Sequence, residues 1–231
     1  HEYNMSFKAG ETRSSMKRIG KVGARNTGTT IRFWPDPKYF DTANLALPRL
    51  KHTMRAKAVL CPGLKLKFHD EDSGAKEEWL YEHGISTYLT ESMDGVELIP
   101  PEPFAGESEG ESESLAWAAH WCEEKAELVT ESYVNLVPTP QGGTHVAGFR
   151  QGLLEALREF CDNRNLLSRG VKLAAEDVFE HITYVLSVKL EEPQFSGQTK
   201  ERLSSRACAT FVSGVVRDVF SLWLDEQYEY G

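Results

Sequence analysis

The last third of the chain contains the pattern that most constrains its fold. Apolar residues recur there at steps of three and four, which is the spacing of one face of an α-helix. This stripe consists of Val212, Val215, Val216, Val219, Phe220 and Trp223. A helix with such a stripe is stable only when the stripe is buried, so we expect a long helix from about Thr199 to Gln227 that packs on a core.

The expected start of this helix places a cation in an unfavourable position. Residues 193–206 read PQFSGQTKERLSSR, so Lys200 would lie in the first turn, where the helix dipole is already positive. Either Lys200 extends into water from a solvated turn, or it lies beside exposed backbone N–H groups where an anion such as phosphate binds. The local sequence leaves both interpretations open.

The remaining patterns predict short strands that alternate with helices. After the turn at Gly142-Gly143, Thr144 can cap a helix whose apolar face recurs through residue 160, and residues 45–58 suit another helix. β-Branched and aromatic runs predict strands at 30–34, 64–68, 114–122, 127–137 and within 177–190. The acidic stretch 102–114 is poor in apolar groups and predicts an exposed loop. The fold class expected is therefore α+β.

Charge divides the chain into two parts near residue 84. Residues 1–84 hold 15 Lys and Arg against 10 Asp and Glu, whereas residues 85–231 hold 11 against 25. A basic first part could lie near a nucleotide or nucleic acid, with Arg25, Lys51 and Arg55 as contacts, but charge balance alone favours solvated surfaces. We expect two domains, 1–84 and 85–231.

Several classes of protein are disfavoured by the sequence. No apolar run approaches the roughly 18 residues of a membrane span, and the first residues lack the pattern of a secretion signal. Cys61, Cys122, Cys161 and Cys208 lie far apart, which indicates neither a zinc site nor a disulfide framework, and we expect no metal site and a cytoplasmic location. Because the chain begins at His1 rather than Met, we expect a fragment.

Four stretches resemble the ATPase subunit of bacterial type IIA DNA topoisomerases, in order and spacing, over essentially the whole chain. They are NTGTTIRFWP (26–35), ESYVN (131–135), QGGTHVAGFR (141–150) and residues 193–206. Within that family, RAKAVLCPG (55–63) and LLSRGVKL (166–173) are more similar to the B subunit of topoisomerase IV than to the B subunit of gyrase.

The resemblance implies a fold for each part. Residues 1–84 resemble the C-terminal portion of a Bergerat-type ATP-binding domain, and residues 85–231 resemble the transducer domain, which has a ribosomal protein S5 domain 2-like fold. In the family, the general base, the Mg²⁺ ligand and the adenine-reading Asp precede the stretch at Thr27. The resemblance therefore implies that the Mg²⁺ ligand is not in this chain and that the fragment alone is inactive.

The resemblance also implies roles for individual residues. Thr29 corresponds to a threonine near the adenine of ATP, although a threonine that opens a strand is commonly explained by β-propensity alone. Gln198 and Lys200 correspond to a pair that contacts the γ-phosphate, with Lys200 in a catalytic role. Arg150 corresponds to a residue that faces a DNA cavity between two transducer domains, and the alternative is an exposed arginine paired with an acid.

The function that the resemblance implies is that of an ATP-operated clamp. Such a protein uses ATP and Mg²⁺, forms a homodimer through its ATPase region, captures double-stranded DNA, and drives strand passage, relaxation and decatenation with the A subunit of topoisomerase IV. The alternative is a non-enzymatic α/β scaffold or DNA-clamp module without ATP chemistry. An upstream E-x-x-x-N helix and a glycine-rich lid would distinguish the enzyme from the scaffold.

Overall fold

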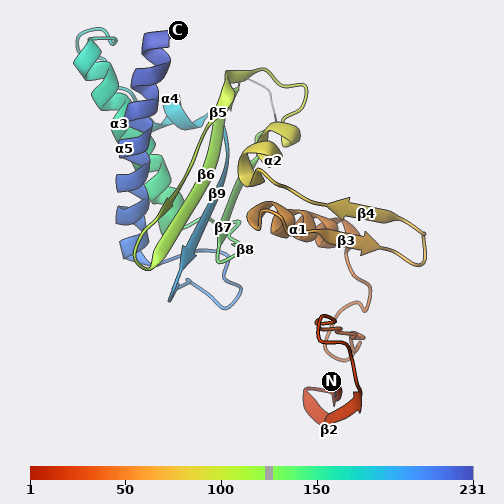
Figure 1. The fold of residues 1–231 in the computed structure, drawn as a ribbon. Coiled ribbons are helices and arrows are strands. Elements are labelled where there is room, and N and C mark those ends of the chain that lie inside the picture. Colours follow the sequence, from red (N-terminus) through yellow and green to blue (C-terminus); the bar gives the residue numbers. More distant parts are fainter. Residues whose placement is uncertain (123–126, 231) are drawn as a thin grey trace. The chain divides into compact units, whose positions relative to one another are not determined.

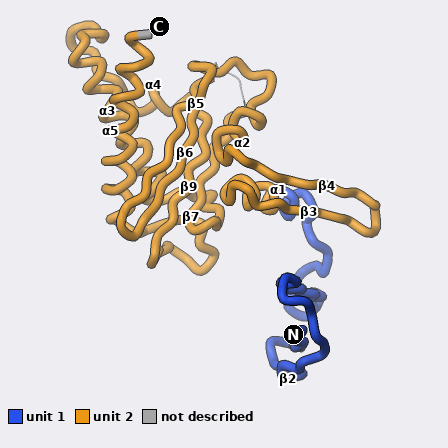
Figure 2. The backbone as a smooth tube through the Cα atoms, viewed as in Figure 1, with its two compact units in different colours: residues 1–51 blue, residues 52–231 orange. Residues whose placement is uncertain are grey.

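The computed structural model of the chain describes residues 1–122 and 127–230. The chain forms two compact units, residues 1–51 and residues 52–231, which are coloured separately in Figure 2.

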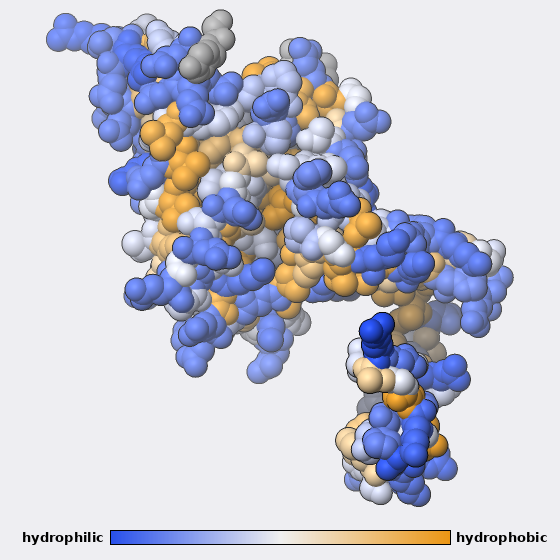
Figure 3. All heavy atoms as spheres, in the orientation of Figure 1, coloured by the Kyte–Doolittle hydropathy of each residue, from blue (hydrophilic) through white to orange (hydrophobic). Residues whose placement is uncertain are grey.

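Unit 1 contains one antiparallel hairpin, made by β1 (Glu2–Lys8) and β2 (Glu11–Gly20). Much of its apolar surface is exposed, including Tyr3, Phe7 and Met16, and apolar side chains are visible on this unit in Figure 3. The strand predicted at 30–34 is wrong, because these residues belong to no strand in the described part of the chain. Their β-branched and aromatic side chains favour an extended backbone, but a strand also needs a hydrogen-bonded neighbour.

Unit 2 is built on a five-stranded sheet with the strand order β5-β6-β9-β7-β8. Its strands are β5 (Leu98–Glu109), β6 (Glu113–Cys122), β7 (Thr130–Val134), β8 (Val137–Pro138) and β9 (Ile182–Leu190). In this sheet β7 and β9 pair in parallel, and the other neighbouring strands are antiparallel. The strand predicted at 114–122 is confirmed, and so is the one within 177–190.

The exposed loop predicted at 102–114 is wrong, because most of this stretch forms β5 and its hairpin with β6. Phe104 of β5 is fully buried, and Gly106 packs against the indole of Trp117. A Cβ on Gly106 would lie 2.6 Å from that ring, so this glycine provides close packing rather than a turn. The acidic residues that suggested a loop lie on a solvated edge strand instead.

Two long helices, α3 (Thr144–Arg164) and α5 (Arg206–Tyr230), lie side by side on one face of the sheet (Figure 1). The apolar stripes predicted for both helices are confirmed in the core that they form with the sheet, except at Val219, which is exposed. This core includes Phe104, Trp117, Phe149, Leu153, Leu186, Val212, Val216 and Phe220. By length and composition α5 could also cross a membrane, a test that core helices of soluble proteins pass as well.

The start predicted for the last helix is wrong, because α5 begins at Arg206 and residues 191–205 form a loop. Lys200 is therefore not in a first helical turn, and the helix dipole does not act on it as expected. The cap predicted at Thr144 is also wrong. Gly143 is the N-cap of α3, and the Thr144 hydroxyl is buried without a hydrogen-bond partner among the described residues.

The opposite face of the sheet is covered by a smaller layer. It consists of α2 (Gly84–Ser92) and the C-terminal end of α1 (Leu47–Leu60). A separate hairpin of β3 (Leu66–His69) and β4 (Lys76–Trp79) lies between α1 and α2 in the sequence and extends away from the sheet (Figure 1). Val59, Tyr88 and Leu89 from these helices pack against Ala118 and Val185 of the sheet. A short helix, α4 (Ala175–Phe179), precedes β9. The division into domains at residues 84 and 85 stays a prediction.

Candidate functional site

The loop of residues 191–205, which connects β9 to α5, carries Gln198 and Lys200. Its two arms are joined near the base by backbone hydrogen bonds. The Ser196 N–H donates to the Arg202 carbonyl at 3.0 Å, and the Ser204 N–H donates to the Gln194 carbonyl at 2.8 Å. The loop is therefore a narrow hairpin with a fixed base.

Leu203 fixes this hairpin to the turn that precedes α3. Its N–H donates to the Gly142 carbonyl at 3.1 Å, and its carbonyl accepts from the Thr144 N–H at 3.1 Å. Gly143 lies between these two contacts with φ of 134°, and a Cβ there would lie 2.3 Å from the Leu203 carbonyl oxygen. Only glycine fits this position, so the base of the loop and the first turn of α3 are held as one piece.

Gln141, in the same turn before α3, also binds the loop, at residues closer to its tip. Its backbone N–H donates to the Glu201 carbonyl at 3.1 Å, and its side-chain amide donates to the Glu201 carboxylate at 2.9 Å. The Gln141 carbonyl in turn accepts from the Arg202 guanidinium at 3.2 Å. The two charged residues that follow Lys200 along this arm are thus engaged with Gln141.

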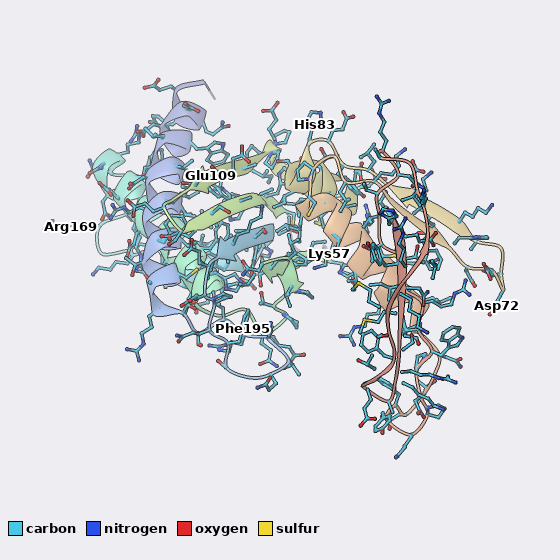
Figure 4. All side chains as sticks on the ribbon, turned by 60° about the horizontal axis from the view of Figure 1, so that its bottom comes forward. Lys57, Asp72, His83, Glu109, Arg169 and Phe195 are labelled. Carbon is cyan, nitrogen blue, oxygen red and sulfur yellow. The ribbon has the colours of Figure 1, made fainter. Side chains whose placement is uncertain are left out.

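The tip of the loop, residues 197–200, presents exposed hydrogen-bond donors, among them the Gln198 amide and the Lys200 ammonium. The Lys200 backbone is in the left-handed region, with φ of 59°, and its N–H donates to the Gly197 carbonyl at 3.2 Å. The ammonium lies 5.9 Å from the centre of the Phe195 ring, and Figure 4 labels Phe195 on this loop. Within the described residues, no carboxylate lies within 4.0 Å of the ammonium.

An unpaired ammonium and a nearby amide on a fixed loop fit a phosphate oxygen, because both supply donors and the ammonium supplies positive charge. The arrangement does not extend to a metal. Among residues 1–122 and 127–230, no group of three His, Cys, Asp or Glu side chains is placed to hold a metal ion.

A buried histidine lies directly behind the base of the loop. His145, in the first turn of α3, is fully buried, and its Nε2 lies 3.0 Å from the Thr139 hydroxyl. Its Nδ1 has no hydrogen-bond partner among the described residues. Burial lowers the pKa of His145 to about 4, because the charged ring would lose its hydration, and the ring is therefore neutral at pH 7.

Thr29 belongs to unit 1, whereas the loop belongs to unit 2. Thr29 is exposed and lies in a segment without regular structure. The structure therefore brings together Gln198 and Lys200, and the role of Thr29 stays a prediction.

Arg150 is exposed on α3, and its guanidinium lies 4.4 Å from the centre of the Phe179 ring. No carboxylate of the described residues lies within 4.0 Å of it, so the pairing with an acid that was the alternative is not present. The hollow around it is also lined by Glu176 and Glu180, so its charge environment is mixed. Burial raises the pKa of nearby Tyr184, and the Arg150 charge opposes that rise.

The residues that hold the loop in place are not predictable from local sequence patterns. Leu203 contacts residues about sixty positions away in the sequence, and the contacts of Thr139 with His145 and Ser132 lie six and seven positions apart but belong to no periodic pattern. The Gly142-Gly143 pair is the one available signal. It predicts a turn, but it does not indicate that Leu203 approaches Gly143 closely.

Comparison with known proteins places this fold in a family. A family model described as DNA gyrase B matches residues 84–231, which is more than half of the chain. The chain therefore belongs to the DNA gyrase B family.

Individual relatives indicate which subunit within this family the chain is similar to. The B subunit of DNA topoisomerase 4 from Pseudomonas aeruginosa is 59% identical over 231 residues, which are 100% of this chain and 37% of that protein. The protein of the same name from Escherichia coli K12 is 53% identical over 227 residues, 98% of this chain and 36% of that protein. The solved topoisomerase IV ATP binding domain of Francisella tularensis, in complex with a small molecule inhibitor, matches with a TM-score of 0.82 and 38% identity.

That structural match covers 97% of this chain and 61% of the solved chain. The mixed helix and sheet fold is thus the fold of topoisomerase IV and gyrase B ATPase structures. The match to the B subunit of topoisomerase IV extends over the whole length of this chain. The chain spans about a third of the length of the curated relatives it matches. The comparisons give no support to a non-enzymatic scaffold.

Proposed function

We propose that this chain is part of the ATPase subunit of a type IIA DNA topoisomerase, the B subunit of topoisomerase IV. In that protein, ATP binding and hydrolysis drive DNA strand passage, and so relaxation and decatenation. The observation that carries this proposal is the unpaired Lys200 ammonium at the tip of a loop whose base is clamped to α3. The similarity to the B subunit of topoisomerase 4 over the whole chain supports it.

The two parts of the chain would divide the work. Residues 1–84 form the C-terminal portion of a Bergerat-type ATP-binding domain, in which Thr29 lies near the adenine. Residues 85–231 form a transducer domain of ribosomal protein S5 domain 2-like fold, and its loop carries Gln198 and Lys200. The mixed sheet with α3 and α5 on one face supports this assignment.

The loop residues would act on the terminal phosphate of ATP. When bound, ATP supplies the phosphoryl group and the free energy of its hydrolysis. Gln198 would donate an amide N–H to a phosphate oxygen and so orient that group. Lys200 would hold a positive charge where negative charge increases during phosphoryl transfer, and because the loop is fixed in advance, little reorganisation is needed. Mg²⁺, which the resemblance implies for the full subunit, would be held by residues outside this chain.

The partners follow from the same assignment. The protein would form a homodimer through its ATPase region and act in the cytoplasm with the A subunit of topoisomerase IV on double-stranded DNA. Arg150 would face the DNA, since it is exposed and has no acidic partner within ion-pair distance among the described residues. Its flat guanidinium, stacked on Phe179, remains free to donate hydrogen bonds to phosphate oxygens.

Substitution of Lys200 tests the phosphate contact. In the full-length protein, Lys200→Ala should lower ATP turnover roughly a hundredfold, the usual cost of losing one preorganised donor, while nucleotide affinity changes little. Stability should stay the same, because Lys200 lies in an exposed loop six residues before α5 and alanine keeps the same backbone strain. Turnover, nucleotide affinity and melting temperature are measured on the same variant.

Lys172→Ala is the matched control, since it removes an exposed lysine from a different loop. Its turnover should equal that of the wild type. Wild-type turnover in Lys200→Ala would end the proposal that this loop contacts the phosphate.

A further inference from the structure

Three buried polar side chains, linked by hydrogen bonds, lie next to the base of the loop, and the proposed function does not use them. His145 Nε2 lies 3.0 Å from Thr139 Oγ1, which lies 2.7 Å from Ser132 Oγ. The Ser132 hydroxyl is also 3.0 Å from the Thr139 carbonyl oxygen. All three residues are buried, and they belong to α3, to the turn before it and to β7.

One arrangement of protons gives every donor among these three side chains an acceptor. His145 Nε2–H donates to Thr139 Oγ1, the Thr139 hydroxyl donates to Ser132 Oγ, and the Ser132 hydroxyl donates to the Thr139 carbonyl. His145 Nδ1 is then a bare acceptor, which is consistent with its having no partner among the described residues. The reverse arrangement would leave an Nδ1–H donor buried and unpaired. The geometry thus favours the neutral Nε2–H tautomer.

The hydrogen bonds of these side chains, together with those of the backbone, hold the segment 139–145 in a bracket that contacts Leu203. The Gly142 N–H donates to the Thr139 carbonyl at 2.8 Å, and Leu203 pairs with Gly142 on one side and Thr144 on the other. The hydrogen bond from His145 to Thr139 joins the end of this segment to its beginning. The segment 139–145 is therefore a ring, and the arm of the loop that follows Lys200 passes against it.

We propose that Thr139 and His145 are positioning residues, which hold the segment 139–145 closed around Leu203 and so set where the loop presents Gln198 and Lys200. The proposal rests on the proposed function of that loop. Neither residue touches the phosphate, and both act through Leu203 and the backbone of the loop.

A polar chain suits this task better than an apolar contact would. Hydrogen bonds are directional, and three linked hydrogen bonds, each with a narrow range of distance and angle, allow few arrangements of the turn. A charged donor misplaced by about 1 Å loses on the order of a hundredfold in rate. The link to Ser132 also ties the bracket to β7 in the central sheet.

A pair of substitutions at Thr139 tests the proposal in the full-length protein. Thr139→Val keeps the shape and removes the hydroxyl, whereas Thr139→Ser keeps the hydroxyl. Thr139→Val should lower kcat on the order of tenfold, with nucleotide affinity within about twofold of the wild type, since the misplaced ammonium acts mainly in the transition state. Thr139→Ser should keep kcat within about twofold.

Amide hydrogen exchange provides a readout that does not depend on activity. The Leu203 and Thr144 amides, which close the bracket, should exchange at least tenfold faster in Thr139→Val than in Thr139→Ser, measured relative to amides of the central sheet in the same variant. Equal exchange in the two variants would overturn the proposal, and so would an unchanged kcat in Thr139→Val.

A double substitution separates positioning from general damage. If Thr139 acts through Lys200, then Thr139→Val should not lower kcat further in a Lys200→Ala background. A further tenfold loss there would overturn the proposal. If Lys200→Ala has wild-type turnover while exchange is faster in Thr139→Val, the proposed function fails and the bracket's role in fixing the loop stands.

Discussion

At the scale of single residues, burial of His145 links the fold to pH. Its pKa is lowered to about 4, whereas the ordinary value of 6.5 applies to the unfolded chain. The folded state therefore favours the neutral ring. This contribution to stability is complete above pH 6.5 and is lost as the pH falls from 6.5 towards 4, because the unfolded chain takes up the proton first.

We predict a loss of about 3 kcal/mol in the free energy of unfolding from this residue over that window, since each pKa unit corresponds to about 1.4 kcal/mol. Denaturant unfolding at pH 7.5 and 4.5 measures it. The pH dependence should be smaller in His145→Gln, which keeps an N–H donor for Thr139. Burial also lowers the pKa of His120, so the difference between wild type and variant isolates His145. A ring titration with its midpoint near pH 6.5 would contradict this prediction.

At the scale of elements, the contact between α3 and α5 depends on two glycines of α3. A Cβ on Gly148 would lie 2.5 Å from the Ala209 carbonyl oxygen, and one on Gly152 would lie 2.7 Å from the Ser213 carbonyl oxygen. Glycine is a poor helix former, so its use at these two positions is explained by the close approach of the α5 backbone.

Gly152→Ala should therefore lower the free energy of unfolding by about 2 kcal/mol, because the helices must move apart to accept the methyl group. Gly214→Ala is the matched control within α5. Nothing lies within 4 Å of a Cβ there, so alanine should raise stability by about 0.5–1 kcal/mol through helix propensity. Denaturant unfolding measures both, and equal stability of the two variants would show that the close approach carries no cost.

At the scale of the whole molecule, ATP turnover and DNA capture are expected to be coupled, and Arg150 tests that coupling. In the full-length protein, Arg150→Gln should weaken the stimulation of ATP turnover by DNA and leave basal hydrolysis nearly intact. DNA affinity should also lose about one unit of its salt dependence if the guanidinium contacts a phosphate.

Arg150→Lys keeps the charge and should retain most of the stimulation, although it loses the flat stacking on Phe179. An equal fall in basal and stimulated rates in Arg150→Gln would indicate a structural role for the contact between α3 and α4 instead.

The periodic patterns in the sequence determined the parts of the fold that depend on burial. The stripes through Phe149 and Phe220 predicted α3 and α5, because a helix that buries one face must repeat its apolar residues at helical spacing. β-Branched and aromatic residues within 177–190 predicted β9, because such side chains favour a strand. Resemblance in short motifs, rather than periodicity, identified Gln198 and Lys200 as candidate phosphate contacts.

Only the tertiary structure decided where elements end and what holds the loop. The side chains of residues 30–34 favour an extended backbone, but these residues have no strand partner in the described part of the chain. Residues 102–109 form a strand because β6 pairs with them. The helix start moved from Thr199 to Arg206 because the preceding residues hydrogen-bond to the turn before α3. The pairing of Leu203 with Gly142 joins residues about sixty positions apart, and no local pattern encodes such a contact. Local sequence sets conformational preference, but hydrogen-bond partners brought together by folding decide which preference is realised.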